Sequence, residues 1–350
     1  LFFIDIIWLQ NQKEMVRYLV ILLLLFSEAQ GQVIINASAP YRFLNQDLLL
    51  DSFPNSAGAY SLRKLDKDYA GSAIRIRKDT TGQPEQDIGF TSDGWIDTAV
   101  IKSFINARSA YVVTWYDQSG NSRNITQSVQ ADQPRIANTG VIYRQNTKPC
   151  VVFDGSSDYL AAATSSHWTF LHSGGKYTVF TVAKAGLVTD PEAAYLLWGT
   201  TLTTLQRGSY LMHDTRSSAS RDRVLVHVIA RLSDALVAGI VALNSQTAGS
   251  TPANTMFLSY VLGDPDNATT TERSAIATNS ASVQKNATSD NTSWNAVPFH
   301  PLQIGAAKNS AGVNTLFLNG SVSEVIFYSS DQSSNRTSIS NNINLFYAIY

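Results

Sequence analysis

The sequence predicts an all-β fold, a jelly-roll β-sandwich with a strand-like N-terminal tail and a C-terminal helix. Many short runs of aromatic and β-branched residues are separated by polar turns, as in sandwiches built from short antiparallel strands. Helical spacing is confined to a few short segments. Charged residues make up only 15% of the chain, against about 25% in typical soluble domains.

The N-terminus has the pattern of a secretory leader. Residues 1–14 precede Met15 and form an upstream segment that we exclude from the fold. A short positive start, an apolar run and small residues suited to cleavage follow within residues 15–31. The apolar run is too short to span a bilayer. We therefore expect a signal peptide at 15–31 and a secreted, extracellular protein that begins near Gln32.

Residues 32–48 form an extended tail ahead of the domain, which we place at 49–350. Pro40 interrupts any continuous strand in the tail. Its residues with strand character are Val33, Ile34, Ile35, Tyr41 and Phe43. An extended segment of this kind can add to the sheet edge of a neighbouring copy. Such a head-to-tail contact does not close, so it can propagate a homopolymer.

The first elements of the domain follow from their residue periodicity. Residues 57–65 fit a short helix or strand. Residues 73–77 alternate with period two, which predicts a strand with Ile74 and Ile76 facing inward. Residues 97–105 have an Asp at the N-cap position and an apolar helical face, so they predict a helix.

Residues 111–121 are the stretch around which the domain is organised. Residues 111–116 predict a half-buried strand. Asp117 to Asn121 then provide residues that favour a tight turn. Trp115, Asp117 and Asn121 are candidate glycan contacts, and capping of the turn by Asp117 and Asn121 is the favoured alternative.

The rest of the domain reads as further short strands and a closing helix. The predicted strands lie at 148–153, 159–160, 177–183, 195–198, 210–212, 223–230, 256–262, 302–306, 315–318 and 322–328. The Ser/Thr/Asn-rich residues 269–294 predict a long exposed loop. Ile339, Ile343 and Phe346 have helical spacing, so we expect a C-terminal helix packed on one sheet.

The composition excludes several classes of function. A formal net charge of −1 provides no field for nucleic acid. Cys150 is the single cysteine, which rules out an intrachain disulfide and suggests a buried structural thiol. No cofactor is implied, and no later stretch is long enough for a membrane helix. Glycosylation sequons, which matter only in a eukaryotic source, occur at Asn36, Asn124, Asn267, Asn286, Asn291, Asn319 and Asn335.

Several motifs resemble one enzyme family. They include Ala59-Tyr-Ser-Leu-Arg-Lys-Leu65, Gln86-Asp-Ile-Gly-Phe90, Trp115-Tyr-Asp-Gln-Ser-Gly-Asn121, Phe153-Asp-Gly155 and the hairpin at 317–328. These stretches resemble the catalytic domain of arabinofuranosidase B, glycoside hydrolase family 54, and the hairpin is common to concanavalin A-like and laminin-G-like domains. The resemblance implies a concanavalin A-like jelly roll and is best over residues 49–155.

The catalytic carboxylates that this resemblance implies are missing. A retaining glycosidase needs a nucleophile and an acid/base about 5 Å apart. The family's acid/base position corresponds to Ile304-Gly-Ala-Ala-Lys308, which has no carboxylate, and residues 196–214 contain no glutamate. We therefore predict a degenerate, non-catalytic domain.

Other constellations are weak. Asp154, Ser157 and Asp158 fit a calcium site or, more simply, a turn. His213-Asp214 has no accompanying nucleophile motif, and His227 lies within a predicted strand as a core or face residue.

Three hypotheses of function remain. The first is a secreted structural subunit of an extracellular filament or surface assembly, which associates with itself through the tail. The second is a carbohydrate-binding, adhesive, lectin-like module. The third is an arabinofuranosidase with relocated carboxylates.

Overall fold

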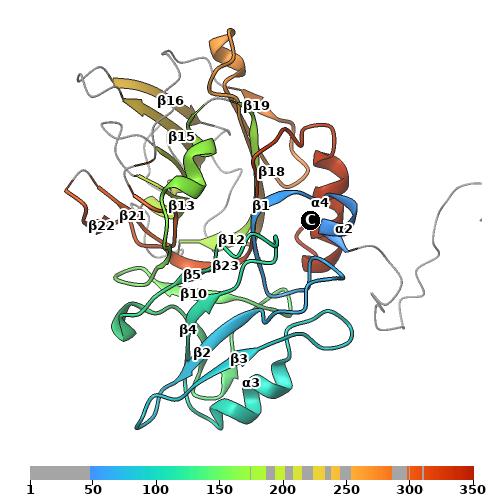
Figure 1. The fold of residues 1–350 in the computed structure, drawn as a ribbon, viewed down its shortest axis with the longest axis vertical. Helices are drawn as coiled ribbons and strands as arrows, with labels where there is room; N and C mark the ends of the chain where they lie inside the picture. The colour runs from blue at the N-terminus through green and yellow to red at the C-terminus, as the bar shows by residue number, and fades with distance from the viewer. Residues whose placement is uncertain are drawn as a thin grey trace, which may run out of the picture. The chain divides into compact units, whose positions relative to one another are not determined.

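Strand β23 (Asn319–Tyr328) is the centre of the fold. The computed structural model describes residues 48–173, 175–186, 194–201, 208–214, 224–232, 238–244, 254–285, 298, 300–309 and 311–350. Along one edge β23 pairs with β1 and β10, and along the other with β12 (Figure 1). The layer continues through β17, β18 and β19. Every pairing in it is antiparallel. Its other strands are β1 (Ser56–Ser61), β10 (Val151–Asp154), β12 (Tyr177–Ala185), β17 (Phe257–Gly263), β18 (Ser274–Thr278) and β19 (Gln284–Lys285).

A second set of strands runs from β3 through β2 and β4, and then through β5, β11, β20, β13, β14 and β15 to β16. β6 joins β4 to β10 and so links the two sets. The strands are β2 (Ile74–Lys78), β3 (Glu85–Ile88), β4 (Ala110–Trp115), β5 (Ile125–Thr126), β6 (Arg135–Asn138), β7 (Val141–Ile142), β11 (Leu160–Ala162), β13 (Ala194–Gly199), β14 (Gly208–Asp214), β15 (Val224–Leu232), β16 (Ala238–Asn244) and β20 (Gln303–Ile304). Two separate hairpins pair β8 (Arg144–Gln145) with β9 (Lys148–Pro149), and β21 (Ala307–Lys308) with β22 (Asn314–Thr315). The predicted jelly-roll-type β-sandwich is thus confirmed.

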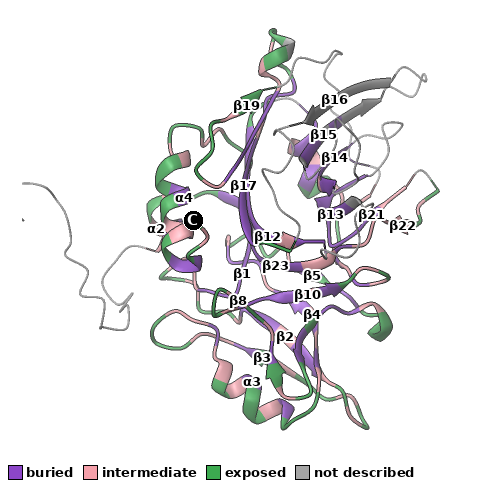
Figure 2. Ribbon diagram, turned by 180° about the vertical axis from the view of Figure 1, so that it is seen from behind, coloured by how far each residue is buried: buried purple, intermediate pink, exposed green. Residues whose placement is uncertain are grey.

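The side chains of β23 alternate between two hydrophobic cores. Val325 and Phe327 face the core between the strand layers, whereas Ile326 and Tyr328 face a second core under the C-terminal helix. All four side chains are fully buried, and the strand is purple over most of its length in Figure 2. This alternation is the period-two pattern of a strand covered on both faces.

The C-terminal helix α4 (Arg336–Tyr347) closes the second core, as its residue spacing predicts. Ile339 and Ile343 are fully buried and Phe346 is nearly so, against residues of β17 and β23. The short helix α2 (Leu49–Ser52) lies beside it and adds Leu49 and Leu50 to the same core (Figure 1). The helical cover is therefore on the outer face of the β23 layer.

Helix α3 (Thr98–Ile105) also begins and ends as its sequence predicts. The Asp97 carboxylate accepts hydrogen bonds from the backbone N–H groups of Ala99 and Val100, which satisfies donors that the first turn leaves free. Ile101 and Ile105 are fully buried. Short 3₁₀ turns occur at η2 (Gln130–Asp132), η3 (Ser166–Leu171) and η4 (Thr270–Glu272).

The predicted exposed loop at 269–294 is wrong at residues 274–278, whereas most of the described residues 279–285 are exposed, as expected. Residues 274–278 form β18, which pairs with β17 and is buried at every position. Ser274, Ala275 and Ala277 are too small to give the sequence signal of a core strand, yet all three are buried. Residues 286–297 lie outside the described residues.

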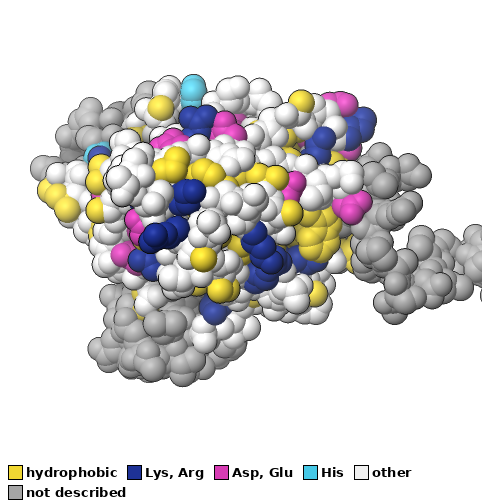
Figure 3. Space-filling model, turned by 90° about the horizontal axis from the view of Figure 1, so that it is seen from below, with side chains coloured by type: hydrophobic (Ala, Val, Ile, Leu, Met, Phe, Trp, Pro, Cys, Tyr) yellow, Lys and Arg dark blue, Asp and Glu magenta, His cyan; other side chains and the backbone are white. Residues whose placement is uncertain are grey.

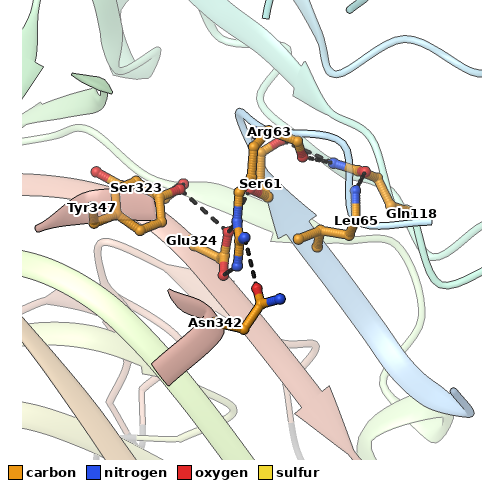
Figure 4. A network of polar contacts seen from close by, with 8 residues as sticks. All are labelled: Ser61, Arg63, Leu65, Gln118, Ser323, Glu324, Asn342 and Tyr347. Atoms are coloured by element: carbon orange, nitrogen blue, oxygen red, sulfur yellow. Dashed lines mark hydrogen bonds and ion pairs between the residues drawn. The ribbon is translucent and has the colours of Figure 1, made fainter. Parts of the chain in front are cut away.

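A buried ion pair ties β1, β23 and α4 together. The Arg63 guanidinium donates Nε–H to Glu324 Oε2 at 2.8 Å and Nη2–H to Oε1 at 2.9 Å. Its Nη1 donates to Asn342 of α4 at 2.8 Å, and Ser61 Oγ donates to Glu324 at 2.7 Å (Figure 4). Burial alone would lower the pKa of Arg63, but Glu324 more than offsets this and holds it above its ordinary value. Because the side chains of Arg63 and Glu324 are 5% and 1% exposed, we assign this network to structure.

Cys150 is fully buried between β9 and β10, as predicted for a structural thiol. Burial raises the pKa of the Cys150 thiol to about 12, so the reactive thiolate is scarce at neutral pH. Among the described helices, none combines the length and apolar character needed to cross a membrane.

Candidate functional site

The Trp115–Asn121 motif braces strand β1. The Asp117 carboxylate accepts the N–H groups of Ala59, at 2.8 Å, and of Ser119 and Arg123, both at 2.9 Å. The Asn121 side chain donates to the Ser56 carbonyl at 2.9 Å. These bonds fit the turn-capping alternative for Asp117.

Gln118, in the same motif, binds the segment that follows β1. Its amide nitrogen donates to the carbonyls of Ser61 and Arg63, both at 3.0 Å, and its oxygen accepts from Leu65 N–H at 2.9 Å (Figure 4). Trp115 is fully buried in the core, so it offers no surface to a glycan. The motif therefore serves the fold, and the candidate site lies elsewhere.

A row of polar side chains crosses the outer face of β2, β4 and β6. Arg77 pairs directly with Tyr111 across β2 and β4, and Tyr111 pairs with Arg135 across β4 and β6. Direct cross-strand partners share a face of the sheet. Both guanidinium carbons therefore lie close to the Tyr111 ring, at 4.5 Å for Arg77 and 5.3 Å for Arg135 from its centroid.

This row lines a cavity of about 290 Å³. The size suits one small ligand, since ligand cavities begin at about 300 Å³. The other walls come from the turn after β2, from η2 and from the turn after β10. The charged and aromatic lining side chains are Arg77, Asp79, Tyr111, Arg135, Asp154 and Asp158. Seen from below, the end of the molecule that carries β2, β3 and α3 shows Lys and Arg side chains spread among uncharged ones (Figure 3).

Arg77 is held in place by three neutral acceptors. Its Nε–H donates to Gln133 Oε1 at 2.6 Å, its Nη1 to the Gln83 side chain, and its Nη2 to the Gln130 carbonyl at 3.3 Å. Only 4% of Arg77 is exposed. Burial lowers the pKa of Arg77 from its ordinary value, and the charge of the exposed Asp79 acts in the opposite direction.

Asp154 and Asp158 lie in one turn at the end of β10. Asp154 Oδ1 accepts the backbone N–H groups of Ser156, Ser157 and Asp158, at 2.8, 2.9 and 3.1 Å. Its Oδ2 accepts from the Ser156 hydroxyl at 2.5 Å. Burial acts to raise the pKa of Asp154, but these hydrogen bonds outweigh it and lower the pKa to about 2.

Asp158 has the opposite shift. Burial, and then the charge of Asp154, raise the pKa of Asp158 to about 7. One carboxyl oxygen, Oδ2, accepts the Asp154 N–H at 3.0 Å. A carboxyl group that changes charge near neutral pH therefore faces the cavity.

The sequence had marked Asp154 and Asp158 but not the arginines. For these two aspartates with Ser157, the hydrogen bonds fit the turn rather than the calcium alternative. Arg77 and Arg135 each lie on the outward side of a strand whose inward neighbours, Ile76 and Ile136, are fully buried. Their alternation in the sequence was a signal, but only the register of three strands brings them together.

The positions that the resemblance would make catalytic hold no exposed carboxylate among the described residues. The segment after Ile304 reads Gly-Ala-Ala-Lys, and its alanines are buried. In β13 and β14 the one carboxylate is Asp214, which is 1% exposed. The neighbouring His213 is fully buried too.

His227 forms a buried network between the strand layers. Its Nε2 lies 2.9 Å from the Tyr177 hydroxyl and 3.1 Å from Ser209 Oγ, and Nδ1 lies 2.6 Å from Ser274 Oγ. Burial lowers the pKa of His227 to about 3, so the ring is neutral. The full burial of these residues matches the predicted core role of His227 and gives a substrate no access.

Some of the glycosylation sequons lie among the described residues and others lie outside them. Asn124, Asn267, Asn319 and Asn335 are half-buried, and Asn319 lies within β23. Asn36, Asn286 and Asn291 lie outside the described residues, as do the leader and the tail residues Val33, Ile34, Ile35, Tyr41 and Phe43. Within the described residues, no group of three His, Cys, Asp or Glu side chains is arranged to hold a metal ion.

Solved arabinofuranosidase structures have a similar fold. A family 54 α-L-arabinofuranosidase soaked with a cyclic sulfate inhibitor matches with a TM-score of 0.58 and 15% identity, over 84% of this chain and 63% of that one. An arabinofuranosidase complexed with arabinofuranosyl-α-1,2-xylobiose matches with a TM-score of 0.52 and 16% identity, over 84% and 63%.

These matches confirm the resemblance and the sandwich fold that the motifs predict. At such identities they show the fold alone, and this chain spans 63% of the length of those proteins. No family model and no curated protein sequence matches the chain.

Proposed function

We propose that this protein is a non-catalytic glycan-binding module and that the cavity over β2, β4 and β6 is its binding site. The observation that carries the proposal is the concentration of planar hydrogen-bonding side chains around one aromatic ring, Tyr111. Such sites fix a small polar ligand through a few well-placed donors and acceptors. Jelly-roll sandwiches are also the fold of many lectin domains.

Several features support binding without hydrolysis. The Asp154 carboxylate already accepts four hydrogen bonds from its own turn. Asp158 belongs to the same turn, so the two carboxyl groups approach a ligand from one side. A glycosidase needs its carboxyl groups to flank the scissile bond. The arabinofuranosidase with relocated carboxylates is therefore the weaker alternative.

The test is glycan binding by the mature chain from Gln32, first on a glycan array and then by calorimetry. We expect Arg135→Gln to weaken binding at least about tenfold, the effect of about 1.4 kcal/mol. Arg108→Gln removes the same charge from an exposed position outside the cavity and is the matched control. Failure of every glycan to bind, or full binding by Arg135→Gln, would contradict the proposal.

A chromogenic arabinofuranoside tests the absence of catalysis. We expect no arabinose release above the rate without protein between pH 4 and pH 8. If the wild type releases arabinose and Asp158→Asn does not, the protein is an enzyme and the proposal of a non-catalytic module is wrong.

The filament hypothesis depends on residues 32–48, of which only Leu48 is described. Self-association and an extracellular location therefore stay predictions from the sequence. A glycan-binding module is compatible with both, since the tail and the cavity involve different residues.

A further inference from the structure

The cavity contains a buried positive charge without an acidic hydrogen-bond partner. Arg77 donates to Gln133, Gln83 and the Gln130 carbonyl, and all of these acceptors are neutral. Burying a cation without a counter-charge is costly. The lowered pKa of Arg77, which burial causes, reflects this cost.

Arg135 adds a second cation next to the first. It lies on the other side of Tyr111 in the cross-strand row, with its guanidinium carbon 5.3 Å from the ring centroid. In the described part of the chain, no ion pair joins Arg77 or Arg135 to an acid. Two like charges thus converge on one ring.

The acids of the cavity do not neutralise these arginines. Asp154 is engaged by its own turn, and Asp79 is on the exposed rim. Asp158 is the acid whose charge is least stable, because burial and Asp154 raise its pKa to about 7. The charged and titratable groups that surround Asp158 are Asp154, Arg135 and Asp132, with Arg77, Asp79 and Tyr111 on the remaining cavity wall.

We propose that the ligand of this cavity is a sugar acid, whose carboxylate binds the Arg135 guanidinium in the field of Arg77 and lies beside the Asp158 carboxyl. This inference rests on the proposed glycan-binding function and specifies its ligand class. Guanidinium groups bind carboxylates through paired hydrogen bonds. The uronic acids, in which a carboxylate replaces the exocyclic CH₂OH of a hexose, have this chemistry.

Binding of the sugar acid is linked to a proton on Asp158. Asp158 Oδ2 accepts from the Asp154 backbone, and Oδ1 has no hydrogen bond among the described residues. A protonated Oδ1 can donate to the ligand carboxylate, whereas an ionised one repels it. Binding above neutral pH therefore requires Asp158 to take up a proton, so affinity falls as the pH rises from 6 to 8.

The experiment compares matched ligands on the mature chain. Calorimetry at pH 6 and pH 8 uses the methyl glycosides of galacturonic, glucuronic and mannuronic acid, each beside its neutral parent hexoside, and sodium acetate. We expect at least one uronide to bind about tenfold more tightly than its parent hexoside. Its affinity should fall about tenfold from pH 6 to pH 8, as one proton is taken up.

Three variants distinguish the effect of cavity charges on binding from a general effect on folding. Arg135→Gln should reduce the affinity for the uronide to that for its parent hexoside, and Arg108→Gln should leave both unchanged. Asp158→Asn retains an acceptor for the Asp154 N–H and should keep the preference for the acid while removing its pH dependence.

Each contrary outcome has a distinct meaning. Hexosides that bind as tightly as the uronides would overturn the sugar acid and leave the glycan-binding function intact. Acetate that binds as tightly as the uronides would also overturn it, since the sugar ring would then play no part. If no glycan or glycoside binds the wild-type chain, both the inference and the proposed function are wrong.

Discussion

Asp154 and Asp158 lie in one turn, yet their pKa values shift in opposite directions. Asp154 accepts three backbone N–H groups and a hydroxyl, which stabilise its charged form. Asp158 has one backbone donor and lies beside the charge of Asp154. At the scale of single residues, burial acts to raise both pKa values. The four hydrogen bonds of Asp154 outweigh burial, whereas the single donor of Asp158 outweighs neither burial nor the charge of Asp154.

Replacement of Asp158 should change how stability depends on pH. The folded-state pKa of about 7 exceeds the ordinary value of 3.8. The folded protein therefore holds more protons than the unfolded chain between these values, and stability falls as the pH rises through this window. Asp158→Asn has no such loss. Because screening at the cavity reduces the effect to about 1 kcal/mol, we expect its melting temperature to exceed that of the wild type by about 2–4 °C at pH 8.

The control for this prediction is Asp93→Asn, at an exposed position outside the cavity. Both variants should melt like the wild type at pH 3.5, where Asp158 is protonated in the folded protein. An Asp158→Asn variant with the same advantage at pH 3.5 and pH 8 would show that the carboxyl does not titrate as described.

At the scale of elements, the sequence predicts a helix or strand correctly where the signal lies within that element. Asp97 caps α3, and Ile74 and Ile76 face the core from β2, because caps and alternation are local properties. Strand β18 was missed because Ile276 is its only large apolar residue and its neighbours are Ser, Ala and Thr. Its faces are buried because Ile276 packs in the core between the strand layers and Ala277 packs in the core under α4, which its own sequence does not show.

Loss of Glu324 should lower the free energy of unfolding, because the Arg63–Glu324 ion pair connects β1, β23 and α4. Glu324→Ala leaves the Arg63 guanidinium buried with only Asn342 as a side-chain acceptor. Breaking a buried pair from one side costs about 3–5 kcal/mol. Urea denaturation monitored by tryptophan fluorescence should show a loss of this size.

Glu272→Ala is the matched control for Glu324→Ala. Glu272 pairs with Lys285 at 2.6 Å, but their side chains are 42% and 49% exposed. Exposed pairs contribute about 1 kcal/mol or less, so this variant should unfold close to the wild type. Equal losses in the two variants would mean that the Arg63 network contributes no more than a surface contact.

At the scale of the whole molecule, the candidate site was beyond the reach of the sequence. Arg77, Tyr111 and Arg135 are distant in the chain, and the registers of β2 on β4 and of β4 on β6 place them in one row. A shift of one residue in either register would turn a side chain of the row toward the core. The sandwich itself was predictable, since many weak strand signals agree on one fold.

Self-association is the prediction that concerns several molecules. If the tail adds as a strand to a neighbour, the chain from Gln32 should form fibres that the chain from Leu48 does not form. The shorter chain keeps the Leu48 carbonyl, which accepts the N–H groups of Asp51 and Ser52 in α2. Light scattering and negative-stain microscopy measure the difference, and identical fibres from both chains would exclude the tail.

The tail deletion needs a control that leaves the tail intact. Arg135→Gln on the chain from Gln32 should assemble like the wild type, because it alters only the cavity. Loss of fibres in this variant would place the contact between copies at the cavity.

The buried Cys150 is a natural probe of local unfolding in this protein. It is the single thiol of the chain, and it is fully buried immediately before β10, which pairs with β23. An alkylating reagent can reach it only when this part of the sandwich opens. The rate at which the wild-type protein is alkylated at Cys150 therefore measures how often this part of the sandwich opens, and no cysteine has to be introduced.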